Sequence, residues 1–182
     1  TEGTVTIGRQ SLQKISFKEW RKHCGVVMQE GFIFGDTIAN NIVPDGNMID
    51  KKRLLYAVEM ANIRDFVESL PLKYNTKIGN TGQGLSQGQK QRILARAIYR
   101  NPDYLFFDEA TNALDTDNEK VIQGNLEKFF KDKTVVIVAH RLSTVKNADQ
   151  IVVLKEGEIT EKGTHDELIT RQGDYYRLVK NQ

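Results

Sequence analysis

Short runs of hydrophobic residues alternate along the chain with longer stretches in which apolar and polar positions are mixed. Six of the short runs predict strands, and four of these six are rich in β-branched or aromatic residues. They cover residues 4–7, 25–28, 104–107, 134–138, 150–154 and 158–161. Two runs, YLFF at 104–107 and VVIVA at 135–139, are apolar throughout, which is typical of parallel strands buried on both faces.

Apolar positions spaced three and four apart predict eight helices between these runs. They cover residues 17–23, 37–42, 51–61, 63–69, 86–99, 117–130, 166–170 and 175–180. Residues 44–100 contain helices and no convincing strand, so we expect a helical lobe beside an α/β core.

The stretch LSQGQKQRILARAIYR at 85–100 places a polar turn that contains glycine directly before a basic helix. A helix N-terminus carries unpaired backbone N–H groups and the positive end of the helix dipole, so this turn has the features of an anion site. Ser86 equally fits an ordinary N-cap, and the pair Ile93/Ala97 gives the helix an apolar stripe that needs no function. On this stretch alone, the N-cap is the favoured interpretation.

Two adjacent carboxylates, Asp108 and Glu109, follow the run YLFF. In open α/β sheets, ligands bind at the carboxyl ends of the strands. Side chains alternate along a strand, so one carboxylate can face a hydrated Mg²⁺ while its neighbour faces a water molecule, as nucleotide hydrolysis requires. The simpler alternative is a strand that merely ends in polar residues.

A histidine, His140, follows the run VVIVA. A lone histidine after a strand is more often a core or surface residue than a catalyst. Two parallel strands would nevertheless bring His140 to the same sheet edge as the two carboxylates. His23 and His165 fall on predicted helical or loop surface without metal-ligand spacing, so we assign them no chemistry.

Composition limits the possible functions. The chain has 182 residues, 39% hydrophobic and 27% charged, which suits one packed domain with a small lobe. A net charge of +2 with interspersed signs is too small to argue for a nucleic-acid partner or an anionic membrane surface. No apolar window approaches the roughly 18 residues of a membrane span and no secretion signal is recognisable, so we expect a soluble cytosolic chain. Cys24 is the single cysteine; it excludes an internal disulfide and is expected to be a core thiol.

Taken in order, VVMQE, GLSQGQKQRILARAI, YLFFDEATNALD and VIVAHRLSTVKNADQIVVLKEGEITEKGTHDELI resemble the nucleotide-binding domain of ABC transporters along the whole chain. Five motifs of that family are matched: the Q-loop by Gln29, the signature motif by residues 85–89, the Walker B pair by Asp108 and Glu109, the D-loop by Asp115, and the switch histidine by His140. Five motifs in the family's order make the resemblance specific.

The resemblance implies a fold, cofactors and partners. The fold is α/β: an incomplete RecA-like P-loop NTPase core with a mostly parallel sheet, at 1–43 and 101–182, and a helical ABC signature subdomain at 44–100. The cofactors are ATP and Mg²⁺. The partners are a second nucleotide-binding domain in a head-to-tail dimer and the transmembrane domain of the same transporter, with no nucleic acid, which places the domain at the cytoplasmic face of the cell membrane.

The same resemblance implies a role for each motif residue. Glu109 would polarise the attacking water and His140 would contact the γ-phosphate, so these two are the catalytic residues. Asp108 and Gln29 would hold Mg²⁺ and the lytic water. The remaining residues would serve the dimer: Ser86, Gly88 and Gln89 by contacting ATP held on the partner's P-loop, and Asp115 by communicating across the dimer.

The segments QEGFIFGDTIANNI and DEATNALD are similar to those of exporters, with bacterial peptide and bacteriocin exporters as the nearest group. Two positions depart from the family pattern: Gln87 replaces a glycine of the signature, and Asn80 stands where exporters usually have glutamate. Phosphate binding should survive the first change, whereas the second removes a charge from a loop that in relatives faces the membrane domain.

A P-loop needs the sequence Gly-x-x-x-x-Gly-Lys-Ser/Thr, and the dipeptide Gly-Lys occurs nowhere in the chain. We therefore expect the C-terminal part of the ATP-hydrolysing subunit of an exporter, beginning after the P-loop helix and inactive on its own. The alternative is a non-catalytic module that lends its signature face to a complete ATPase partner. The presence of Glu109 and His140 favours the first, because an inactive site would be free to lose either.

Overall fold

The computed structural model describes residues 3–28, 32–43, 48–79, 89–108, 116–139 and 145–180, with the backbone alone at 89–93 and 116–120. The chain forms two compact units, Thr1–Val136 and Ile137–Gln182. None of the described helices is both long and apolar enough to cross a bilayer.

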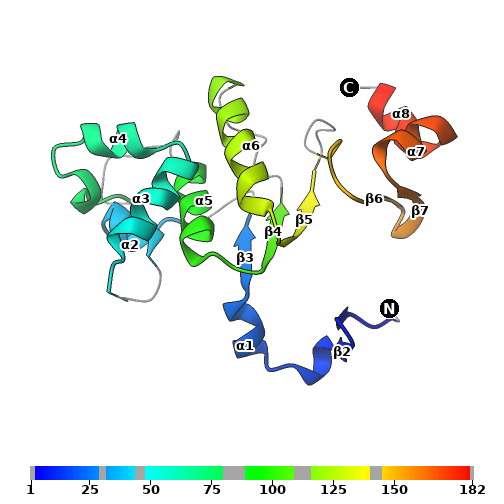
Figure 1. Cartoon of the computed structure of the whole chain (residues 1–182), viewed down its shortest axis with the longest axis horizontal. Coiled ribbons are helices and arrows are strands. Elements are labelled where there is room, and N and C mark those ends of the chain that lie inside the picture. The colour runs from blue at the N-terminus through cyan, green and yellow to red at the C-terminus, as the bar shows by residue number, and fades with distance from the viewer. Residues whose placement is uncertain are drawn as a thin grey trace. The chain divides into compact units, whose positions relative to one another are not determined.

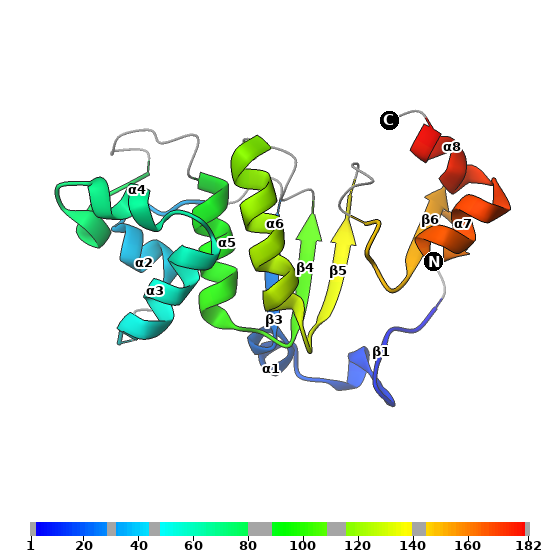
Figure 2. The same ribbon diagram turned by 45° about the horizontal axis from the view of Figure 1, so that its top comes forward.

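The first unit is built on a sheet with strand order β3-β4-β5 (Figures 1 and 2). Strands β3 (Cys24–Val27) and β4 (Tyr104–Asp108) are parallel, in a register that pairs Cys24 with Tyr104 and Val27 with Phe107. Strand β5 (Thr134–Val138) lies on the other side of β4. These bounds confirm the predicted strand at 134–138 and differ by one residue at each end of β3 and at the end of β4.

Apolar packing on one face of this sheet forms the core of the first unit. Leu105 and Phe107 of β4 are buried, and the Phe107 ring lies 5.2 Å from that of Phe130 in α6 (Thr116–Phe130). Helix α5 (Gln89–Arg100) packs against β3 and buries Leu94, Ala95, Ala97 and Ile98. The expected apolar stripe of this helix is therefore confirmed where its side chains are described.

The expectation that both apolar runs are buried on both faces is wrong. Exposed and half-buried positions alternate along β5, where Val136 is 48% exposed. In β3, Val26 is 52% exposed, and its partner Phe106 in β4 is only half-buried. Among the described elements, α5 and α6 cover the Leu105 face, whereas the Val26 face is covered only near the start of β4, where α1 packs (Phe17–Lys22).

The described elements between β3 and β4 are helices, as predicted. This region contains α2 (Ile38–Ile42), α3 (Lys51–Met60), α4 (Arg64–Ser69), the 3₁₀ helix η3 (Lys73–Asn75) and α5. Both α2 and α3 pack against α5. The one strand-like feature described there is an isolated antiparallel bridge between Thr37 and Lys77.

The N-terminal region differs from the single strand expected at 4–7. Two short antiparallel strands, β1 (Thr6–Ile7) and β2 (Gln10–Ser11), form a hairpin that continues into the 3₁₀ helix η1 (Leu12–Lys14). The turn between the strands uses Gly8 at a φ of 58°, a left-handed conformation that glycine adopts without strain.

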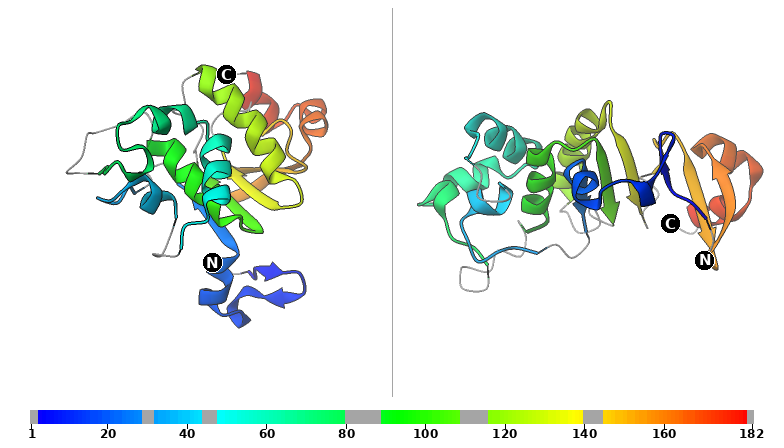
Figure 3. Two further views of the ribbon diagram at one scale, coloured as in Figure 1. Left: turned by 60° about the vertical axis from the view of Figure 1, so that its left-hand side comes forward. Right: turned by 90° about the horizontal axis from the view of Figure 1, so that it is seen from below.

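The second unit is a hairpin packed against two helices (Figure 3). Strands β6 (Ile151–Lys155) and β7 (Glu158–Gly163) are antiparallel, and helices α7 (His165–Arg171) and α8 (Asp174–Lys180) pack on β7. The hydrophobic cluster of this unit contains Ile151, Val153, Leu168 and Tyr175. Helix α7 begins with a capping box in which Thr164 and Glu167 satisfy each other's backbone N–H groups.

Candidate functional site

The candidate site lies at the carboxyl end of β4. Asp108 is the last residue of the strand and is half-buried. Alternation places it on the opposite face from Leu105 and Phe107, on the more open face that also carries Val26 and Phe106. No hydrogen bond or ion pair joins its carboxylate to another described residue. Carboxylate oxygens are preferred Mg²⁺ ligands, so Asp108 fits the metal role that the sequence predicts.

The N-terminus of α5 lies at the same end of the unit as Asp108. The chain descends through the 12 residues of α5 and returns through the five residues of β4. These lengths match, since a helix of this size spans about 18 Å and such a strand about 16 Å. The start of α5 and the end of β4 both lie at the upper end in Figure 2. The positive end of the α5 dipole accordingly points toward the side on which β4 ends.

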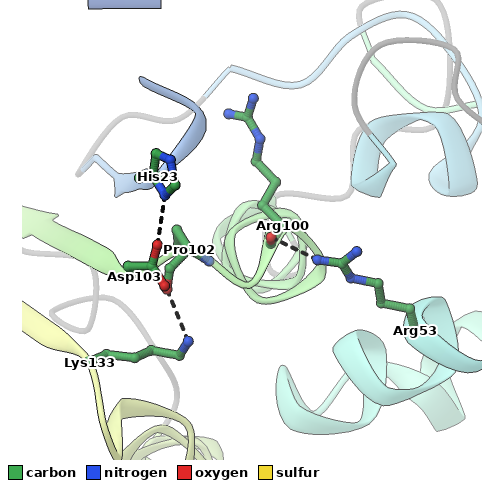
Figure 4. A network of polar contacts seen from close by, with 6 residues as sticks. All are labelled: His23, Arg53, Arg100, Pro102, Asp103 and Lys133. Carbon is green, nitrogen blue, oxygen red and sulfur yellow. Dashed lines mark hydrogen bonds and ion pairs between the residues drawn. The ribbon is translucent and has the colours of Figure 1, made fainter. Parts of the chain in front are cut away.

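Three cationic or titratable side chains fix the connection between α5 and β4 at the opposite end (Figure 4). Arg53 donates to the Arg100 carbonyl at 2.8 Å, and Lys133 donates to the Pro102 carbonyl at 3.0 Å. The Asp103 carboxylate lies 2.7 Å from Nδ1 of His23.

Backbone hydrogen bonds from Tyr104 N to His23 O and from Thr134 N to Asp103 O fix the start of β4 between its two neighbours. Gly25 of β3 is also required here, because a Cβ at this position would lie 2.7 Å from Pro102 Cγ. The start of β4 is thus fixed in position, and with it the direction in which the strand presents Asp108.

Six of the eight predicted site residues lie outside the described residues: Gln29, Ser86, Gly88, Glu109, Asp115 and His140. The departures Asn80 and Gln87 lie outside them as well. In the sequence, Gln29 follows the end of β3 by two positions and Glu109 directly follows β4, and these two strands are paired in parallel. The roles assigned to these residues, and the sharing of one ligand by His140 and the carboxylates, remain predictions.

Sequence reasoning missed Asn41, a polar residue of α2 that is 1% exposed, although the other buried residues of this helix are apolar. Its Oδ1 accepts from Phe34 N at 2.8 Å, and its Nδ2 donates to the carbonyls of Phe34 at 3.0 Å and Thr37 at 2.9 Å. A weaker contact reaches the Asp36 carbonyl at 3.4 Å. An amide amid Ile38, Ala39 and Ile42 was the available signal, since a buried polar group requires partners.

The other titratable candidates have structural partners. His165 Nδ1 lies 2.9 Å from the Tyr175 hydroxyl, and His23 pairs with Asp103. Within the described ranges, no cluster of three or more His, Cys, Asp or Glu side chains is arranged to hold a metal ion. Cys24 is buried at the start of β3, and burial raises the pKa of its thiol, which confirms the expected core thiol.

Comparison with known proteins identifies the chain's relatives. The protein-family model described as "ABC transporter" matches residues 1–112. ATP-binding cassette sub-family B member 5 of Mus musculus is 45% identical over 182 residues, which are all of this chain and 14% of that protein. Multidrug resistance protein 1 of Entamoeba histolytica is 47% identical over 99% of the chain and 14% of that protein.

A bacterial relative and a solved structure are also similar to this chain over its whole length. The ATP-dependent lipid A-core flippase of Syntrophus aciditrophicus is 42% identical over the whole chain and 30% of that protein. The structure of a bacterial Atm1-family ABC exporter with ATP bound matches with a TM-score of 0.93 and 35% identity, over the whole chain and 32% of that protein. The chain thus spans less than a third of the length of each of these relatives.

Proposed function

Because the chain belongs to the ABC transporter family, we propose that it is the C-terminal part of the ATP-binding and hydrolysing subunit of an ABC exporter, which couples ATP hydrolysis to export across a membrane. One observation carries this proposal: the whole chain matches an ATP-bound exporter at a TM-score of 0.93. The α/β fold with a partial RecA-like core agrees with it. None of the relatives named above is described as a peptide or bacteriocin exporter, and that narrower resemblance remains a prediction.

Within this function, Glu109 polarises the attacking water, and His140 contacts the γ-phosphate. Asp108 and Gln29 hold the magnesium ion and the lytic water. The position of Asp108 supports this assignment, because its carboxylate ends β4 on the more open face of the sheet and has no partner among the described residues. Mg²⁺ bound with ATP would neutralise charge on the phosphates.

The signature residues Ser86, Gly88 and Gln89 serve a different nucleotide, the one held on the P-loop of a second nucleotide-binding domain. The support is the start of α5 at Gln89, which directs the positive end of a 12-residue helix toward the signature turn. Asp115 immediately precedes α6 and communicates across the same dimer.

The proposal includes the division of the chain and its surroundings. Residues 1–43 and 101–182 form the ATPase core, and residues 44–100 form the helical signature subdomain. The transmembrane domain of the exporter is the second partner, so the domain works at the cytoplasmic face of the membrane. The alternative is a non-catalytic module that lends its signature face to a complete ATPase partner.

Hydrolysis of Mg²⁺-ATP by the exporter subunit that contains this sequence tests the proposal. Asp108→Asn should lower turnover by about 100-fold or more, since it removes a charged metal ligand. The matched control is Asp65→Asn, which alters an exposed aspartate in the first turn of α4 and should leave turnover unchanged. Equal turnover in the two variants would favour the non-catalytic alternative.

A further inference from the structure

The segment 32–38 follows Gln29 by three positions and leads into α2, and it is held from two sides within the first unit. One side is the chain at 76–79. Ile38 N donates to the Thr76 carbonyl at 3.0 Å, and Ile78 N donates to the Asp36 carbonyl at 2.9 Å.

The contact between Gly79 and Gly35 is too close for a side chain. A Cβ on Gly79 would lie 2.8 Å from Gly35 Cα and 3.0 Å from the Phe34 carbonyl oxygen. Gly79 also has a φ of 110°, which other residues rarely adopt. The segment 32–38 and the chain at 76–79 therefore pack backbone against backbone.

The other side is Arg96 of α5. Its Nε donates to the Asn41 carbonyl at 2.6 Å and its Nη2 to the Phe32 carbonyl at 3.3 Å, while the guanidinium lies 5.1 Å from the Phe34 ring centroid. Burial, with a smaller effect from the charge of Arg100, lowers the pKa of Arg96, so this placement has an electrostatic cost. Among the described residues, no carboxylate pairs with Arg96 to offset that cost.

A purely local role would explain only part of this geometry. An arginine that capped the C-terminal end of α2 would need the Asn41 carbonyl alone. The contacts of Arg96 with Phe32 and Phe34 reach instead the chain that precedes α2. Asn41 continues them, because its amide side chain binds both backbone groups of Phe34.

Both sides lead to the signature stretch at 80–88. The chain at 76–79 directly precedes it, and α5 directly follows it. Arg96 lies about two helical turns from Gln89 on a helix whose apolar face is buried. Segment 32–38 is therefore bonded to residues 76–79, which precede the signature stretch in the sequence, and to α5, which follows it.

We propose that Arg96 and Asn41 are positioning residues that hold segment 32–38, which follows Gln29 in the sequence, against residues 76–79 and α5 on the two sides of the signature stretch. The functional part rests on the proposed function, in which Gln29 helps to hold Mg²⁺. Loosening Arg96 then weakens the use of Mg²⁺ without removing any group that contacts nucleotide.

Hydrogen exchange of the 182-residue chain tests the structural part without any nucleotide. Arg96→Lys keeps the charge but loses the planar group that donates in two directions. The Phe34 amide should exchange about tenfold faster, since charge-assisted hydrogen bonds contribute energies of that order.

The control is Arg53→Lys. Arg53 makes the same kind of contact, 2.8 Å from a backbone carbonyl and 5.2 Å from the Tyr99 ring centroid, but touches no part of segment 32–38. It should leave the Phe34 amide unchanged. Exchange that rises equally throughout the chain in Arg96→Lys, or equally at Phe34 in both variants, would overturn the proposal.

The Mg²⁺ dependence of ATP hydrolysis by the exporter subunit tests the functional part. In Arg96→Lys the Mg²⁺ concentration that gives half the maximal rate should rise about 10-fold, the effect expected when a residue that supports a metal ligand is lost. Turnover at saturating Mg²⁺ should stay nearly unchanged. Partial unfolding would instead lower turnover at an unchanged half-saturation, which would contradict a positioning role.

Two outcomes separate this inference from the proposed function. If wild type hydrolyses ATP and Asp108→Asn does not, an unchanged half-saturation in Arg96→Lys refutes the positioning role alone. If wild type does not hydrolyse ATP, the proposed function and the functional part of this inference both fail. The exchange result still decides the structural part, which is whether Arg96 holds segment 32–38.

Discussion

The indole of Trp20 in α1 lies 4.7 Å from the ring of Tyr104 at the start of β4, with the two planes inclined at 54°. Trp20 is the single tryptophan of the chain. The pair covers the start of the sheet face that is otherwise open at Val26. Trp20 fluorescence therefore reports directly on the sheet that ends in Asp108.

Replacing Tyr104 with leucine should destabilise this sheet. Tyr104→Leu removes the ring pair while keeping much of the apolar volume, so the free energy of unfolding should fall by about 1 kcal/mol. Urea unfolding followed by Trp20 fluorescence measures the loss. Tyr56→Leu is the control, because Tyr56 is half exposed on α3 and should change stability little. An equal loss in the two variants would show that the ring contact contributes nothing specific.

Cys24 predicts a dependence of stability on pH. Burial raises the pKa of its thiol in the folded chain, so the unfolded chain loses this proton first as the pH rises. The contribution of Cys24 to stability is full below about pH 8.5 and declines above it. Urea midpoints measured from pH 7 to pH 10 should therefore fall more steeply for wild type than for Cys24→Ala. Parallel curves would mean that the thiol titrates alike in both states.

The chain alone should bind ATP weakly. It contains no Gly-Lys dipeptide and so lacks the P-loop lysine, and each charge-assisted phosphate contact contributes roughly 1.5–3 kcal/mol. Isothermal titration of the 182-residue chain with Mg²⁺-ATP should show no tight binding, and a phosphate-release assay should show no hydrolysis. Micromolar affinity would mean that the chain holds a phosphate site of a different kind.

Elements set by local pattern could be predicted from the sequence. The run TVVIV predicted β5 with its observed bounds. Helix α3 begins at the expected residue, where Asp50 caps it, and ends one residue earlier than expected. Strand β2 was missed because Gln10 and Ser11 carry no β-branched or apolar signal. Its pairing with β1 depends on the turn at Gly8.

Features that depend on tertiary packing could not be predicted. The apolar run of β5 indicates burial, but exposure depends on which elements cover each face, and Val136 remains 48% exposed. Arg96 resembles any basic residue of an amphipathic helix until the fold brings Phe32 and Asn41 beside it. For the candidate site, the sequence predicted Asp108 at a strand end correctly, whereas its place on the more open face of the sheet came from the structure.

The central claim is that Glu109 activates water for ATP hydrolysis, and Glu109→Gln in the exporter subunit that contains this sequence tests it most directly. The substitution keeps the shape and hydrogen-bonding reach of the side chain but removes its proton-accepting charge, so ATP should still bind while turnover falls about 100-fold or more. The control is Glu158→Gln, at an exposed glutamate that begins β7, which should leave turnover unchanged. Near-normal hydrolysis by Glu109→Gln would contradict the account.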